Sequence, residues 1–194
     1  MKAMSLQKTL PVKLPTSYGL FEVTAYKDQA GEHLVLQKGK ITENTLLRVH
    51  SQCLTGDALA SLRCDCGEQL SQAMKIIAKE GGIVIYLQQE GRGIGLFNKI
   101  AAYHHQDLGL DTVEANIKLG FKDDLREYSI AAEILKDLGV KAVCLLTNNP
   151  RKIESLQKAG LLVTQRRPLT VKSSTLNSAY LKTKQEKLGH LLKI

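Results

Sequence analysis

Alternating apolar and polar residues mark the first quarter of the chain as a set of β-strands. Residues 20–26 (LFEVTAY) and 33–37 (HLVLQ) flank a predicted turn at 28–31, and residues 45–50 (TLLRVH) form a third segment. A period of two places one face of each segment on a core, which is typical of strands. We therefore interpret residues 10–50 as strands, the last of which ends just before Cys53.

Farther along the chain, the hydrophobic pattern predicts helices that alternate with short strands. Apolar residues at 70, 73, 74, 77 and 78 share one helix face, and Gly81 and Gly82 end that helix. Further strands are predicted at 83–88, 142–147 and 161–165, and further helices after Gly95, at 129–138, at 150–159 and from 179 onward, the last with its Lys and Glu side chains in solvent. This alternation predicts a single α/β domain over residues 1–194, with a mixed β-sheet flanked by helices in three layers and antiparallel strands on its N-terminal side. Residues 166–178 show no period and are expected to form a mobile loop.

The net charge of the chain limits the classes of ligand that we expect it to bind. The 194 residues include 27 Lys and Arg against 19 Asp and Glu, and the resulting formal charge of +8 favours a polyanion. The chain has no run of five basic residues, and only six Tyr, three Phe and no Trp are available to stack on bases. We therefore expect a nucleotide ligand and no nucleic-acid partner.

The sequence shows no segment that would place the chain in or across a membrane. Its apolar runs fall short of the roughly 18 residues that cross a bilayer, and residues 1–5 (MKAMS) lack the apolar region of a signal peptide. We expect a cytoplasmic protein with no membrane partner. In that reducing compartment, neighbouring cysteines are expected to bind a metal rather than to form disulfides.

Three of the four cysteines are spaced as C-x10-C-x-C, at Cys53, Cys64 and Cys66. A structural zinc takes four protein ligands, whereas a catalytic zinc keeps one position for water and lowers the pKa of that water to about 7. Because no fourth cysteine lies nearby, the pattern predicts an open metal site. Buried, inert thiols are the alternative, which fits Cys144 in the apolar run AVCLL better than it fits the polar surroundings of Asp65.

Two other segments indicate contacts with an anion. Residues 90–95 (EGRGIG) join a predicted strand to a predicted helix, and their glycines would let backbone N–H groups approach a phosphate. A tight turn without a ligand is the alternative. Lys152 lies in the first turn of the helix at 150–159, where the helix dipole favours an anion over a lysine. A bound anion would explain this lysine, and a solvated surface position is the alternative.

The motifs, taken in order, are those of a known family. They are RVHSQCLTGD at 48–57, LRCDCG at 62–67, QEGRGIGL at 89–96, NK at 98–99, DTVEAN at 111–116, LLTNNP at 145–150 and KLGHLL at 187–192. From about Leu14 to the C-terminus, the chain closely resembles GTP cyclohydrolase II. The resemblance implies a magnesium-dependent homodimeric enzyme of riboflavin biosynthesis. Its reaction, the first of that pathway, converts GTP into 2,5-diamino-6-(5-phosphoribosylamino)pyrimidin-4(3H)-one and releases formate and pyrophosphate.

The same resemblance implies a role for individual residues. The zinc ligands of the family match Cys53, Cys64 and Cys66. Its GTP-binding positions match Arg48, Val49, His50, Ser51, Gln52, Gln69, Glu90, Gly91, Arg92, Thr112, Thr147 and Lys152. Its active-site pair, assigned as proton acceptor and nucleophile, matches Asp124 and Arg126, and a tyrosine implicated in ring opening matches Tyr103.

Two of these roles have alternatives. A guanidinium is a poor nucleophile unless a base such as Asp124 removes its proton, so Arg126 is expected either to attack or to stabilise charge on the α-phosphate. Without the resemblance, residues 122–127 (KDDLRE) would be interpreted as a solvated loop. Gln69 is a candidate for hydrogen bonding to guanine, and a solvent-facing glutamine is the alternative.

Two departures from the family pattern leave other functions open. Gln52 stands where the family usually has Glu, and residues 166–177 lack the usual RNPNN-like stretch. Gln52 alone favours a catalytically impaired, nucleotide-binding regulatory relative. Net charge alone favours a zinc-stabilised nucleic-acid-binding module. The complete set of cysteines and the Asp124 and Arg126 pair favour the enzyme.

Overall fold

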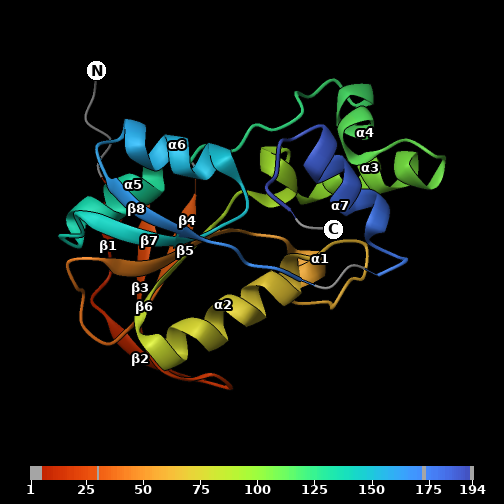
Figure 1. Ribbon diagram of the computed structural model, residues 1–194. Coiled ribbons are helices and arrows are strands. Elements are labelled where there is room, and N and C mark those ends of the chain that lie inside the picture. Colours follow the sequence, from red (N-terminus) through yellow and green to blue (C-terminus); the bar gives the residue numbers. More distant parts are fainter. Residues whose placement is uncertain (1–5, 30, 172–173, 193–194) are drawn as a thin grey trace.

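An eight-stranded mixed β-sheet forms the frame of the protein (Figure 1). The computed structural model describes residues 6–29, 31–171 and 174–192. The strands are β1 Gln7–Lys8, β2 Val12–Thr16, β3 Gly19–Lys27, β4 Glu32–Lys38, β5 Thr45–Ser51, β6 Gly82–Leu87, β7 Ala142–Leu146 and β8 Leu162–Arg167. Across the sheet the order is β1, β3, β4, β6, β5, β7, β8, and β2 also pairs with β3.

The N-terminal half of the sheet is antiparallel, as the alternating pattern predicts. Strands β3 and β4 pair with one another and β4 pairs antiparallel with β6, whereas β6, β5, β7 and β8 run parallel. In β3 the buried Phe21 and Val23 alternate with the exposed Leu20 and Glu22. The short strand β1 lies before the residues predicted to form strands, and β2 lies within residues 10–50 but was not predicted as a separate element.

Helices cover both faces of the sheet and give the three predicted layers. Helices α5 (Ser129–Asp137) and α6 (Pro150–Lys158) lie on one face, and α2 (Cys66–Glu80) lies on the other (Figure 1). Leu47 of β5 packs in the core beneath α5 and α6, and its neighbour Leu46 packs in the core beneath α2. Successive residues of a strand point to opposite faces, so the fully apolar strands are buried on both sides.

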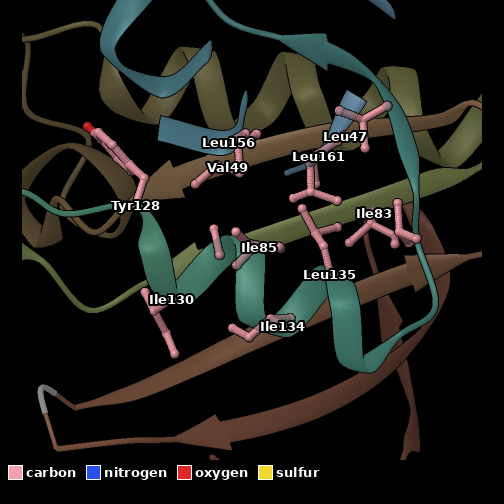
Figure 2. Close-up of a cluster of buried hydrophobic side chains, with 14 of the residues drawn as sticks. Leu47, Val49, Ile83, Ile85, Tyr128, Ile130, Ile134, Leu135, Leu156 and Leu161 are labelled. Atoms are coloured by element: carbon pink, nitrogen blue, oxygen red, sulfur yellow. The ribbon is translucent and has the colours of Figure 1, made fainter. Parts of the chain in front are cut away.

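The larger core lies between the sheet and helix α5 (Figure 2). Ile134 and Leu135 of α5 are fully buried there, together with Ile83 and Ile85 of β6. Burying a side chain of this size stabilises the fold by about 1.5–3 kcal/mol. The parallel strands therefore form a firm base for the residues that follow their carboxyl ends.

The remaining helices gather beyond one end of the sheet (Figure 1). They are α1 Leu54–Asp57, the 3-10 turn η1 Glu90–Gly93, α3 Gly95–Asp107, α4 Thr112–Lys118 and α7 Ser178–Glu186. Helices α1 and α4 were not predicted from the sequence, although Asp111 and Glu114 form a capping box at the start of α4. None of the described helices combines the length and the hydrophobicity that a bilayer crossing requires.

The segment predicted as a loop at 166–178 is shorter than expected. Its first two residues, Arg166 and Arg167, belong to β8, and Ser178 opens α7. Between them Leu169 is buried, and the side-chain amide of Asn148 binds both its N–H and its carbonyl. Residues 172–173 of this segment lie outside the described residues.

Candidate active site

The residues assigned to the site follow the carboxyl ends of neighbouring parallel strands. Cys53 comes after β5, Glu90 after β6 and Thr147 after β7. In open α/β sheets, ligands usually bind at this edge, where the strand order reverses. Two small cavities open here: a metal-side cavity of about 80 Å³ that Cys53 and Cys64 line, and a cation-side cavity of about 50 Å³. The two cavities adjoin along Ser51, Arg92, Arg126 and Tyr180.

Cys53, Cys64 and Cys66 come together as the sequence predicts. All three sulfur atoms lie within 4.8 Å of one another, and those of Cys53 and Cys64 are 3.7 Å apart. A tetrahedral zinc with Zn–S bonds of about 2.3 Å requires sulfur atoms about 3.8 Å apart, so this donor set fits zinc. Cys144 is buried in β7, and its thiol contacts Gln165 at 3.7 Å. Among the described residues, the three clustered cysteines are the one group of its kind that could hold a metal.

Two glycines allow the cysteine cluster to close. A Cβ atom on Gly56 would lie 2.9 Å from the sulfur of Cys64 and 3.2 Å from that of Cys53, and one on Gly67 would lie 2.1 Å from the carbonyl oxygen of Gly56. The short helix α1 therefore packs directly on the start of α2. Cys66 is the first residue of α2.

A buried lysine stands beside the cluster. Lys99 of α3 donates a hydrogen bond to the sulfur of Cys53 at 3.1 Å and another to Glu90 at 2.8 Å. The second carboxylate oxygen of Glu90 accepts from the N–H of Leu54, 2.6 Å away. Burial alone would lower the pKa of Lys99, but the bonds to Glu90 and Cys53 outweigh it and raise this pKa, so the ammonium stays charged. A cation here stabilises thiolate on Cys53.

Tyr103 lies next to this group. Its hydroxyl is 3.1 Å from that of Thr55, which is itself 3.8 Å from the sulfur of Cys53. Burial raises the pKa of Tyr103, so its hydroxyl keeps its proton at neutral pH. Tyr103 is thus a proton donor in the lining of the metal-side cavity.

The cation-side cavity gathers positive charge. Its cationic lining residues are Arg48, Arg92, Arg126, Lys152 and Lys184. Lys152 is buried and donates to the carbonyl of Val49 at 2.8 Å, so the alternative of a solvated lysine is wrong. Burial and then the positive charges of Arg48, Arg126 and Lys184 lower the pKa of Lys152 well below its usual value. A bound anion would raise the pKa of Lys152 again and keep its ammonium charged, and a charged ammonium is what phosphate binding requires.

Gln69 is buried rather than solvent-facing. Its amide oxygen accepts from Arg48 at 2.7 Å, and its amide nitrogen donates to Asp65 at 2.6 Å. Arg48 also donates to the carbonyl of Leu146 at 3.1 Å. Gln69 therefore orients Arg48, and the role of Gln69 in binding guanine stays a prediction.

Asp124 and Arg126 form a bidentate ion pair. The carboxylate oxygens lie 2.8 and 2.6 Å from Nε and Nη2 of the guanidinium. Their side chains are 4% and 15% exposed, so the interpretation of 122–127 as a solvated loop is wrong for this pair. Arg126 lines both cavities.

The glycine segment after β6 places Arg92. Gly91 and Arg92 both have φ near 61°, and Arg92 donates to the hydroxyl of Thr112 at 2.9 Å. A left-handed conformation costs a non-glycine residue roughly 1 kcal/mol or more, and such strain is concentrated at functional sites. Nη1 of Arg92 is buried and has no partner among the described residues, which leaves it available to a ligand.

Val49, His50 and Thr147, which were also assigned to GTP binding, are placed differently relative to the site. The side chain of Val49 is buried in the core under α5, so only its backbone is directed to the site. His50 accepts from Arg48 at its Nδ1 (3.4 Å) and lies 3.1 Å from Asp57 through Nε2, which fits a neutral imidazole protonated on Nε2. Burial lowers the pKa of His50 in agreement with that state. Thr147 lines the cation-side cavity.

Comparison with known proteins identifies the family. The family model of GTP cyclohydrolase II matches residues 7–168. The chain belongs to the GTP cyclohydrolase II family. A protein named GTP cyclohydrolase-2 from Tolumonas auensis is 53% identical over 193 residues, covering 97% of this chain and 98% of that relative. A second, from Campylobacter hominis, is 50% identical over 189 residues and covers 97% of both chains.

Other relatives are longer. The riboflavin biosynthesis protein RibBA from Chlorobium phaeovibrioides is 50% identical over 192 residues, which are 96% of this chain and 47% of that protein. The chain thus spans about half the length of the RibBA relatives and nearly all of the relatives named GTP cyclohydrolase-2. Membership of the GTP cyclohydrolase II family confirms the resemblance stated from the motifs and supports an enzyme of riboflavin biosynthesis.

Some site residues were assigned no individual role from the sequence. Lys99 and Lys184 are both buried, although lysines in amphipathic helices usually lie in solvent. The expectation that the lysines of the last helix are solvated is wrong for Lys184. Gly56 had no signal either, because only the folded cluster shows what its missing Cβ would meet.

Proposed function

We propose that the protein hydrolyses GTP, opening the imidazole ring of guanine and releasing formate and pyrophosphate, in the first step of riboflavin biosynthesis. One observation carries the proposal: two members of a cluster of three cysteines, Cys53 and Cys64, line a cavity that adjoins a second cavity lined by cationic side chains. This arrangement suits a substrate with a reacting base at one end and a triphosphate at the other. The names of family members of comparable length support the same reaction.

Cys53, Cys64 and Cys66 would hold the zinc ion. When bound, it would supply Lewis-acid activation of water at neutral pH, which hydrolysis at C8 of guanine requires. Tyr103 would donate a proton as the ring opens, since its hydroxyl is protonated and lies within 3.1 Å of Thr55 beside the cluster. Lys99 would keep Cys53 ionised.

The triphosphate would occupy the cation-side cavity. Lys152, Arg92 and Arg48 each offer a positive charge there, and Nε of Arg48 is buried without a partner among the described residues. Arg126 would stabilise the charge that develops on the α-phosphate as pyrophosphate leaves. Asp124, which binds two nitrogen atoms of Arg126, would fix the orientation of that guanidinium.

Magnesium would enter with the substrate. Glu90 is the one carboxylate among the described residues that line the two cavities, and it already binds Lys99 and the N–H of Leu54. The phosphates of GTP, together with water, would therefore supply most of the oxygen ligands of Mg²⁺. The homodimer, the cytoplasmic location and the lack of nucleic-acid and membrane partners stay predictions of the sequence.

A catalytically impaired regulatory relative is the second candidate function, and Gln52 is the observation that favours it. The experiment that separates the two is incubation of the purified protein with GTP and Mg²⁺, followed by assays for formate and pyrophosphate. Both products are expected with GTP, and neither is expected with ATP.

Matched cysteine variants connect this reaction to the metal. Cys66→Ser removes a clustered sulfur, whereas Cys144→Ser changes a thiol in β7 outside the cluster. We expect Cys66→Ser to lose zinc and turnover and Cys144→Ser to keep both. Binding of GTP without turnover in the wild type would instead support the regulatory relative. Loss of zinc from Cys144→Ser alone would contradict the ligand set.

A further inference from the structure

Asp65 stands between two of the clustered cysteines in the sequence, and its carboxylate is engaged elsewhere. It occupies the N-cap position of α2 but caps no N–H of that helix. Its side chain is 1% exposed. The carboxylate accepts from Lys184 at 2.8 and 3.1 Å and from Gln69 at 2.6 Å. The loop that carries Cys64 and Cys66 is thus joined by side-chain hydrogen bonds to α7 and to Gln69.

Lys184 comes from the far end of the chain. It lies in α7, 119 residues after Asp65, and its side chain is 9% exposed. Two buried charges of opposite sign stabilise one another, and removal of one leaves the other desolvated and unpaired. The segment that carries Lys184 lies beyond residues 7–168, the part of the chain that the family model matches.

Lys184 and Lys99 place positive charge on two sides of the cysteine cluster. Three thiolates around Zn²⁺ carry a net charge of −1, and the carboxylate of Asp65 adds a further negative charge beside them. Lys99 faces this charge at Cys53, where its ammonium lies 3.1 Å from the sulfur. Lys184 faces it on the side of Cys64 and Cys66, through Asp65.

The hydrogen bonds of Asp65 also connect it to the cation-side cavity. Asp65 binds Gln69, and Gln69 binds Arg48, whose side chain lines the cation-side cavity together with Lys184. A change in Lys184 would therefore reach both the metal loop and Arg48. Lys182, two residues away on the same helix, is 69% exposed and pairs only with Glu186 in the described structure.

We propose that Lys184 is a positioning residue that fixes the metal-binding loop through Asp65 and, through Gln69, sets the orientation of Arg48. This inference rests on the proposed zinc site. It gives α7 a part in the active site, although Lys184 itself need not touch the reacting atoms. Substitution of residues that orient metal ligands typically costs 10–100-fold in metal affinity.

A double-mutant cycle tests the proposal with zinc affinity as its main readout. The variants are Lys184→Met, Asp65→Asn, the double variant and, as a matched control, Lys182→Met. Zinc affinity is measured by competition with a chromogenic chelator, KM and kcat are measured with GTP, and circular dichroism checks the fold. The double variant contains no unpaired buried charge, so it covers the case in which Lys184→Met alone fails to fold.

We expect Lys184→Met to weaken zinc binding about 10–100-fold and to raise KM for GTP, and Lys182→Met to match the wild type. In the Asp65→Asn background, Lys184→Met should change zinc affinity by less than about threefold. Zinc affinity of Lys184→Met within twofold of the wild type would overturn the proposal, as would full additivity of the two substitutions. A wild type that binds zinc but does not turn over GTP would refute the proposed function and leave this cycle interpretable. A wild type that binds no zinc would refute both.

Discussion

The carboxylate of Asp124 holds the guanidinium of Arg126 through two hydrogen bonds of 2.8 and 2.6 Å. Burial raises the pKa of Asp124, but the bonds and charge of Arg126 outweigh this and lower it. Burial likewise acts against the cation of Arg126, yet its charged neighbours, Asp124 among them, raise its pKa further above the usual value. Both groups are therefore ionised, and Arg126 has no free lone pair for attack.

We predict that Arg126 acts as a charge stabiliser and not as a nucleophile. Arg126→Lys loses the two-bond contact with Asp124 and should lower kcat by roughly 10²–10³-fold, with a smaller change in KM. Arg167→Lys is the control, because Arg167 makes a similar two-bond contact with Glu80, at 2.6 and 3.0 Å, and lines neither cavity. Mass spectrometry of turnover quenched in alkaline denaturant, which preserves a P–N bond, should find no nucleotide attached to Arg126. A nucleotide adduct on Arg126 would show the opposite mechanism.

Gly56→Ala should disturb the metal site more than the fold. Its Cβ would approach the sulfur of Cys64 to 2.9 Å, so the cluster must open, and zinc affinity should fall about tenfold or more. Gly120→Ala is the contrasting variant: a Cβ there meets nothing within 4 Å, but φ is +85°, which costs an alanine about 1 kcal/mol. Gly120→Ala should lower Tm and retain zinc. Equal zinc affinity in wild type and Gly56→Ala would show that the cluster adapts.

The sequence predicted the fold where one pattern dominates. Strands β6 and β7 are continuous apolar segments, and α6 begins at Pro150, directly after its N-cap Asn149, whose side chain accepts from the N–H of Arg151. Short elements such as β1 and α1 were missed because two or four residues cannot display a period. The end of β8 was also misplaced, because Arg166 and Arg167 pair with β7 although their side chains are polar.

The site was predictable only where a motif fixes the chemistry. The spacing of the cysteines predicted a metal cluster, and the cluster forms. The pair of Lys184 with Asp65 joins segments 119 residues apart, and the pair of Lys99 with Glu90 joins α3 to the turn η1 before it. Each member alone is of a residue type that usually lies on the surface. Their burial follows from the packing of α3 and α7 beyond the sheet, which no local pattern encodes.

Stability should fall in mild acid because of His190. Burial, followed by the positive charges around the cation-side cavity, lowers the pKa of this histidine to about 2. In the unfolded chain the pKa is about 6.5, so below that pH the unfolded state binds a proton that the folded state does not. The contribution of the neutral His190 to the free energy of unfolding is therefore complete above pH 6.5. As the pH falls from 7 to 5, the free energy of unfolding decreases by up to about 2 kcal/mol.

Urea unfolding of the wild type and His190→Gln at pH 7 and pH 5 measures this contribution. Glutamine does not titrate, so the variant should lose less free energy of unfolding between the two pH values than the wild type does. The difference between the two proteins isolates His190 from the other titrating groups. An identical pH dependence in both proteins would mean that His190 has the same pKa in the folded and the unfolded state.

Gln52 is the position at which the chain departs most clearly from its family, and the structure shows what a carboxylate there would meet. Its backbone N–H donates to Leu87 at 2.8 Å, which holds residue 52 at the end of β5. Its side chain makes no hydrogen bond with the described residues and lies where the metal-side cavity adjoins a wider cleft of about 730 Å³, next to Glu90. A glutamate would add negative charge beside Glu90, the thiolates and a triphosphate.

We therefore expect Gln52→Glu to change kcat by less than about tenfold at saturating GTP and Mg²⁺. The amide of Gln52 can donate and accept hydrogen bonds, so it suffices if residue 52 only orients the substrate. It neither titrates nor binds Mg²⁺ as well as a carboxylate, so it would fail if residue 52 had to accept a proton or hold the metal. Steady-state kinetics of the two proteins distinguish these cases. The small change is expected because the cysteines, Asp124 and Arg126 are all in place. A gain of a hundredfold or more in Gln52→Glu would instead identify the natural chain as catalytically impaired and would favour the regulatory function.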